Sequence, residues 1–254
     1  MLAPWVRQRY FMNYNHKNHH QAPILTVRDL SISFDSQDIL KNVSFSVNEG
    51  DVLAIIGPNG AGKTILFKAL IGLIPYNGEI KWRDDIKIGY VPQKLPENIY
   101  LPLTVKEFLI LKSKNLFFKD RELLSDIGHE LKSFSLDTEI LNQPLTILSR
   151  GELQRVLVVF AALGHPNVLL FDEPTAGVDI AGENTIYNSF HKLQDERGLT
   201  TLIISHDLNI VYRYATNVMC LNKEQICFGE PKKTLTNEQI VRLYGESAFY
   251  HHLH

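Results

Sequence analysis

The sequence predicts an α/β fold with a largely parallel central sheet, because continuously apolar runs alternate with segments of helical spacing. The runs are Val52–Ile56, Val168–Phe171 and Thr201–Ile204, and each leads through a glycine-rich or polar segment into a helical pattern. A strand that is apolar on both faces is typical of a parallel sheet covered by helices. With 254 residues, the chain is long enough for one large domain that carries an inserted subdomain.

An N-terminal antiparallel β layer is expected ahead of the first buried strand. Ile24–Val27, Leu30–Phe34 and Val43–Val47 alternate apolar and polar residues, as half-buried strands do. Residues 1–23 precede this pattern and are expected to form a flexible extension.

A helical subdomain is expected at about 96–148, inserted between the first two buried strands. This segment holds charged helical stretches without a strong strand signal. Near the C-terminal end, residues 218–221 and 225–228 predict a β-hairpin, and Thr236–Tyr244 predicts a helix with Thr236 as its N-cap. The main domain would therefore span 24–245, followed by a histidine-containing tail at 246–254.

The charge balance excludes a global attraction to nucleic acid or anionic lipid, since 26 basic residues stand against 28 acidic ones. No nucleic-acid partner is expected. No apolar run approaches the roughly 20 residues that a membrane-spanning helix needs. Cys220 and Cys227 lack a CxxC or zinc-ligand spacing, so we expect two buried thiols in a reducing cytosol.

A phosphate-binding motif, G-x-x-x-x-G-K-[ST], stands between the first buried strand and a helical segment. Its residues are Gly57, Pro58, Asn59, Gly60, Ala61, Gly62, Lys63 and Thr64. Backbone N–H groups of such a loop surround phosphate oxygens, and the positive end of the helix dipole adds to the attraction. Lys63 is expected to neutralise the β and γ phosphates of ATP, and Thr64 to offer its hydroxyl to Mg²⁺.

Two carboxylates, Asp172 and Glu173, follow the second buried strand and are expected beside the phosphate loop if the strands are neighbours. Asp172 is the candidate magnesium partner. Glu173 is the candidate that orients and deprotonates the attacking water in an in-line displacement. An Asp-Glu pair alone is most often a solvated strand end, and the phosphate loop is what favours the catalytic interpretation.

From about Ile24 to Gly245 the sequence resembles the ATP-binding subunit of an ABC transporter, a P-loop NTPase. Leu148–Glu152 stands where this family carries its LSGGQ-type signature, ahead of a helix and about twenty residues before Asp172. The other matches are Gln93 for the Q-loop, Asp179 for the D-loop, His206 for the switch histidine and Phe34 for the aromatic residue that stacks on adenine.

The resemblance implies that two copies of the chain sandwich two ATP molecules head to tail. Ser149 and the N–H of Gly151 would then bind the γ-phosphate held by the other subunit. Gln93 would reach metal or water, His206 would contact the γ-phosphate, and Asp179 would shape the subunit contact.

The resemblance also implies partners and a location. A separate membrane permease would dock on the helical subdomain, at the cytoplasmic face of the cell membrane, and an extracytoplasmic metal-binding protein would complete the system. The sequence is most similar to the zinc/manganese import branch, in Gly151–Leu157 and Pro174–Asp179. Another cargo, such as an iron chelate, and a regulatory ABC ATPase without a transport role stay as alternatives.

Arg150 departs from the family pattern because it replaces the first glycine of the signature. If this position needs a positive φ, arginine adds strain and weakens turnover. If the residue is already helical, its side chain can point outward or add positive charge near the phosphate. We favour the helical interpretation.

Overall fold

The computed structural model describes residues 22–35, 37–93, 102–113, 121–173 and 180–245. The expected flexible extension, the histidine-containing tail and Asp179 fall largely or wholly outside these ranges. The expectations for them are therefore not tested.

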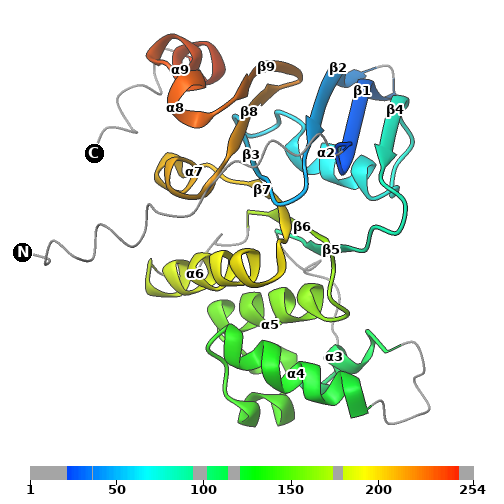
Figure 1. Cartoon of the computed structure of the whole chain (residues 1–254), viewed down its shortest axis with the longest axis vertical. Helices are drawn as coiled ribbons and strands as arrows, with labels where there is room; N and C mark the ends of the chain where they lie inside the picture. The colour runs from blue at the N-terminus through cyan, green and yellow to red at the C-terminus, as the bar shows by residue number, and fades with distance from the viewer. Residues whose placement is uncertain (1–21, 36, 94–101, 114–120, 174–179, 246–254) are drawn as a thin grey trace, which may run out of the picture.

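Nine strands of the described chain form one sheet in the order β4-β1-β2-β9-β8-β3-β7-β6-β5 (Figure 1). Their bounds are β1 Leu25–Phe34, β2 Gln37–Val47, β3 Val52–Ile56, β4 Asn77–Trp82, β5 Ile88–Val91, β6 Val168–Asp172, β7 Thr200–Ile204, β8 Asn217–Asn222 and β9 Glu224–Gly229. The pairs β3–β7, β3–β8, β5–β6 and β6–β7 are parallel. The antiparallel pairs are β1–β2, β1–β4 and β8–β9.

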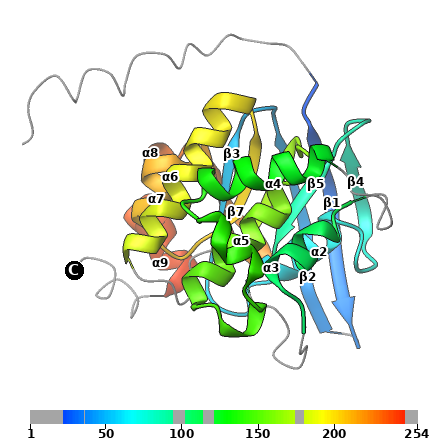
Figure 2. The same cartoon turned by 90° about the horizontal axis from the view of Figure 1, so that it is seen from below.

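The helices cover both faces of the parallel strands. Their bounds are α2 Lys63–Leu70, α3 Val105–Ile110, α4 Arg121–Ser133, α5 Arg150–Ala162, α6 Ile180–Arg197, α7 Leu208–Tyr214, α8 Pro231–Thr234 and α9 Asn237–Tyr244. In Figure 2, α6 and α7 lie on one side, and α2 lies beside β1 and β2 on the other. Two apolar clusters form the core, one on each face, and alternate residues of β3 such as Ala54 and Ile55 belong to different clusters.

The sequence predicted this architecture correctly in its main parts. All three apolar runs are buried strands, and the antiparallel layer is built by β1, β2 and β4. The C-terminal hairpin is β8–β9, and Thr236 caps α9 by accepting a hydrogen bond from the Gln239 N–H. The strands β4 and β5 were not predicted, because each is short and only partly buried.

The described part of 96–148 is helical, with α3, α4 and two short 3₁₀ segments at Thr138–Asn142 and Leu145–Ile147. Figure 1 shows α3, α4 and α5 gathered at the end of the molecule away from β1, β2 and β4. An Arg197–Glu130 ion pair of 2.6 Å joins α6 to α4. The helical segment is therefore tied to the core through α6.

The expectation of two free thiols is wrong, because Cys220 and Cys227 form a disulfide. The two residues are direct cross-strand partners in the β8–β9 hairpin, with Cα atoms 4.8 Å apart. This separation lies within the range that a disulfide bridges. The sequence spacing between the cysteines gave no such signal, since only the register of the hairpin brings them face to face.

Within the described ranges, no helix has both the length and the apolar character needed to cross a membrane.

Candidate nucleotide-binding site

The phosphate loop begins where β3 ends, and its backbone fits between β2 and β8. A Cβ atom on Gly57 would overlap the Leu221 carbonyl oxygen of β8. Gly62 has a φ of 94°, and a Cβ there would lie 2.5 Å from a methyl group of Leu40 in β2. Glycine is required at Gly57 by close contact with backbone and at Gly62 by the left-handed backbone.

The N-terminus of α2 has no side-chain cap and no acidic residue in its first turn. No side chain therefore caps these N–H groups from within the helix, and the carboxylates close to this terminus come from Asp172 and Glu173 at the end of β6. Lys63 is buried, and its Nζ donates to the carbonyl oxygens of Gly57 at 2.8 Å and Pro58 at 3.0 Å. Burial lowers the pKa of Lys63, while the carboxylates of Glu173 and Asp172 oppose the shift.

Asp172 ends β6, and β7 lies between this strand and β3. Although the two strands are not neighbours, Thr64 reaches across and donates its hydroxyl to Asp172 Oδ1 at 3.1 Å. The Tyr90 hydroxyl donates to the other oxygen, Oδ2, at 3.4 Å. Burial raises the pKa of Asp172, and the hydrogen bond from Thr64 partly offsets that shift.

Glu173 follows Asp172 with a φ of 49°, a strained value for a residue that is not glycine. Its N–H donates to the Ile204 carbonyl at the end of β7 at 3.2 Å, which fixes the turn to the edge of the sheet. The Gln93 side chain, just beyond β5, donates from Nε2 to Glu173 Oε2. The structure thus brings together Gln93 and Glu173, two of the three residues that the sequence assigned to catalysis, the third being His206.

His206 stands two residues beyond β7 and is exposed. Its neighbour Ser205 donates its N–H to the Ile55 carbonyl at 3.2 Å, which keeps the end of β7 beside the strand that leads into the phosphate loop. Phe34 ends β1 with 39% of its surface exposed. An aromatic face left open there is available to a flat ligand.

Ser149 and Gly151 lie at the N-terminus of α5, and no hydrogen bond joins them to the phosphate loop within the described chain. Ser149 caps the helix, and the Glu152 carboxylate accepts from the Ser149 N–H at 2.9 Å and from its hydroxyl at 2.7 Å. These bonds lower the pKa of Glu152. Arg150 is the first helical residue, is exposed and has no positive φ, so the helical interpretation is confirmed.

The donor set fits a triphosphate and Mg²⁺. The uncapped α2 N-terminus and Lys63 present N–H donors and a cation to phosphate oxygens, and Thr64 beside Asp172 offers the hard oxygen ligands that Mg²⁺ prefers.

Sequence reasoning missed three residues near this site. Tyr90 donates to Asp172, and Gln93, three residues further on, was the signal noted in its segment. Lys223, in the β8–β9 turn, donates its N–H to the Ala61 carbonyl at 3.0 Å. Burial raises the pKa of Tyr244 at the end of α9, and the nearby Gly57 N–H opposes that shift.

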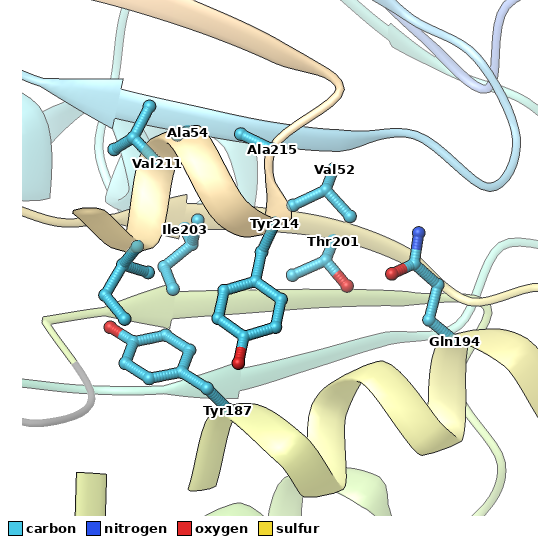
Figure 3. A pocket seen from close by; sticks show the side chains of 10 residues that line it. Val52, Ala54, Tyr187, Gln194, Thr201, Ile203, Val211, Tyr214 and Ala215 are labelled. Atoms are coloured by element: carbon cyan, nitrogen blue, oxygen red, sulfur yellow. The ribbon is translucent and has the colours of Figure 1, made fainter. Parts of the chain in front are cut away.

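A cavity of about 30 Å³ lies away from these residues, between α6, α7 and the sheet (Figure 3). Tyr187, Tyr214 and Ile203 line it, and Gln194 closes one end. A volume of this size holds about one or two water molecules. It is too small to be the nucleotide site.

Comparison with known proteins shows the family. Residues 40–176 match the ABC transporter family. The chain is an ABC ATPase. It is 38% identical to the zinc import ATP-binding protein ZnuC of Buchnera aphidicola, over 91% of this chain and 96% of that protein. Identity to ZnuC 1 of Hahella chejuensis is 37%, over 89% of this chain and 85% of that protein.

A solved metal-chelate type ABC transporter in an inward-facing conformation has the same fold. It superposes with a TM-score of 0.78 at 27% identity, covering 88% of this chain and 89% of that chain. The ABC ATPase fold predicted from the phosphate loop and the order of the later motifs is confirmed.

Proposed function

We propose that this ABC ATPase powers the import of a divalent metal ion, zinc or manganese, through a separate membrane permease. The assignment of the cargo rests on one observation: relatives that match about nine-tenths of the chain are named zinc import ATP-binding proteins. The site itself is a phosphate and magnesium site and does not select the transported ion.

The residues of the phosphate loop bind and orient ATP in this proposal. Lys63 exchanges the carbonyl oxygens of Gly57 and Pro58 for β- and γ-phosphate oxygens, which is favourable because a charged partner replaces two neutral ones. Mg²⁺ held by Thr64 and Asp172, with Gln93 near it, would neutralise the charge that develops on the phosphates.

Glu173 accepts the proton of the attacking water. In the structure its carboxylate takes the hydrogen bond of Gln93, so Gln93 has to turn away, or share that bond with water, before Glu173 can act as a base. His206 would contact the γ-phosphate from the end of β7.

Two copies of the chain would complete two sites. At the N-terminus of α5, Ser149 is exposed and Gly151 partly exposed, and no hydrogen bond of the described chain joins them to the phosphate loop. In a head-to-tail dimer this helix terminus faces the γ-phosphate bound by the other copy. Asp179 would lie at the subunit contact, and Phe34 would stack on the adenine. ATP then joins the copies, and its hydrolysis releases them.

The helical segment formed by α3 and α4 is the proposed docking surface for the permease. Gln93 precedes α3 in the chain, and we propose that a movement of Gln93 at the phosphate site is transmitted to that surface. We also propose, from the family resemblance, that the chain lies at the cytoplasmic face of the membrane and works with an extracytoplasmic metal-binding protein.

The decisive experiment measures uptake in cells that lack this chain. Radioactive zinc and manganese uptake should fall, and should return with the wild-type chain but not with Glu173→Gln. Glu173→Gln should still bind ATP and should accumulate as a dimer. Unchanged uptake of both ions would overturn the metal-ion proposal.

A second candidate cargo is a metal chelate, favoured by the structural similarity to a metal-chelate type transporter. The same deletion strain distinguishes the two. Loss of ferric-chelate uptake with normal zinc and manganese uptake would identify the chelate as the cargo.

A further inference from the structure

The disulfide between Cys220 and Cys227 lies in the hairpin that supports the phosphate loop. Cys220 is in β8 and pairs in register with Ile56, the last residue of β3 before the loop. The next residue, Leu221, places its carbonyl against Gly57 so closely that no Cβ fits between them. The cross-link is therefore one residue away from a direct contact with the loop.

The turn of the same hairpin holds the middle of the phosphate loop. The Lys223 N–H donates to the Ala61 carbonyl at 3.0 Å, and the Lys223 carbonyl accepts from the Lys41 N–H of β2 at 2.8 Å. Lys223 has a φ of 61°, so the turn depends on both strands being held in register. The hairpin thus contacts the loop at Gly57 and again at Ala61, on either side of the phosphate cradle.

The two cysteines differ in exposure. Cys220 is fully buried, whereas Cys227 is partly exposed. Strand β9 pairs with β2 through a single bridge, Lys41 with Glu224, and its Cys227 segment has backbone pairing with β8 only within the described chain. A strand segment with backbone pairing on one side opens locally more easily than one paired on both sides, so we infer that a reductant approaches from Cys227.

We propose that Cys220–Cys227 is a thiol–disulfide exchange site whose opening loosens the phosphate loop and weakens nucleotide binding. This inference rests on the proposed role of the phosphate loop. Disulfides are uncommon in proteins of reducing compartments, and those that occur there are mostly catalytic or redox-sensing. The location proposed above puts the chain in such a compartment.

The reductant is a cellular dithiol. One of its thiolates attacks the Cys227 sulfur, the Cys220–Cys227 bond breaks, and Cys220 leaves as a thiolate that takes up a proton. The second thiol of the reductant then attacks the mixed disulfide and releases Cys227. Two electrons and two protons pass from the dithiol to the protein, and the dithiol becomes a disulfide.

The consequence follows from preorganisation. Anion binding by a loop of N–H groups depends on those groups being held in position before the ligand arrives. With the bond closed, β8 and β9 keep Leu221 and Lys223 in place behind the loop. With the bond open, β8 and β9 lose their cross-link, and both contacts weaken.

The test uses the full chain, in which Cys220 and Cys227 are the two cysteines of the sequence. Any thiol-specific effect therefore belongs to this pair. Alkylation and mass spectrometry should find both cysteines blocked after mild peroxide treatment and both free after a dithiol reductant. A fluorescent ATP analogue should bind about fivefold or more weakly to the reduced chain. Hydrogen exchange of residues 53–63, measured without nucleotide, should become faster on reduction.

Cys227→Ala is the matched control, because it removes the bond at its more exposed end. It should bind the analogue with the affinity of the reduced chain, with or without reductant. The proposal is overturned if the cysteines never pair, or if opening the bond changes neither affinity nor exchange. If neither redox state binds the analogue while exchange still responds to reduction, the coupling stands and the proposed nucleotide site fails.

Discussion

The N-termini of α2 and α5 are both assigned to phosphate, yet they differ in how their N–H groups are used. At α2 the cap residue is Gly62, no side chain caps the helix, and the first turn holds no carboxylate. At α5, Ser149 and Glu152 cap each other, so a hydroxyl and a carboxylate already occupy the helix terminus.

This difference indicates two different tasks. In the proposed function, the α2 terminus binds an anion in the single chain, and the β8–β9 hairpin contacts the loop ahead of it at Gly57 and Ala61. The α5 terminus is capped by its own side chains in the single chain, and we propose that it exchanges this cap for phosphate when a second copy binds. On this proposal the first terminus binds nucleotide and the second responds to dimerisation.

Of the substitutions at the two helix termini, Lys63→Ala should have the largest effect on nucleotide affinity. It removes the cation of the open terminus, so nucleotide affinity should fall roughly 100-fold, the value of a lost charged hydrogen-bond set. Titration with a fluorescent ATP analogue measures the loss. Lys68→Ala, which removes another lysine five residues further along the same helix, should bind normally. Tight binding by Lys63→Ala would contradict the assignment of the phosphate loop.

Ser149→Ala should distinguish the role of the α5 terminus from that of the α2 terminus. Removal of the helix cap should cost about 1 kcal/mol of stability, and nucleotide affinity of the single chain should not change. ATP-driven dimerisation in the Glu173→Gln background should fall sharply, as measured by size-exclusion chromatography with light scattering. Weakened binding to the single chain would mean that the two termini are not independent.

Glu152→Gln should strengthen ATP-driven dimerisation, whereas Ser149→Ala should weaken it. Glutamine keeps the capping geometry but removes a negative charge from the terminus that receives phosphate. A charge there is worth about 0.3–1 kcal/mol, so dimerisation should need roughly twofold to fivefold less ATP. The same light-scattering titration gives the result. If dimerisation weakens instead, the carboxylate helps to bind nucleotide and does not compete with it.

The smallest effect is on the pH dependence of stability. Hydrogen bonds from Ser149 hold the folded pKa of Glu152 below its ordinary value of 4.5. The stabilisation is therefore complete above that pH and is lost as the pH falls through the folded pKa. Denaturant unfolding measures the free energy of unfolding of the wild type and of Glu152→Gln. The difference between the two free energies should shrink as the pH falls from about 6 to about 4. If the difference in unfolding free energy is constant over this pH range, the ionised Glu152 carboxylate does not stabilise the helix cap.

The candidate site could be predicted from the sequence wherever one short segment carries the whole requirement. Residues 57–64 are such a segment, because spacing, glycines and the flanking strand and helix are all local. The α5 capping box was present as Ser149 and Glu152 three residues apart, and it was missed because the segment was interpreted only as a signature.

Other parts could not be predicted because they depend on residues far apart in the chain. Tyr90 reaches Asp172 only because β5 pairs with β6, and Thr64 reaches it across β7. Gln93 and Glu173 were each proposed from their own segment. Their contact could not be predicted, because it depends on the ends of β5 and β6 lying side by side. The cysteine expectation failed for the same reason, since hairpin register and not spacing decides whether two thiols meet.

The sequence by itself determined the phosphate loop, the three buried strands as elements and the carboxylate pair, because backbone conformation and hydrophobic periodicity depend on neighbouring residues. Only the tertiary structure decided which groups stand behind the loop, how the α5 terminus is occupied, and that Cys220 and Cys227 are bonded. These are distances across the sheet, and they are fixed by strand order and register, which no local pattern specifies.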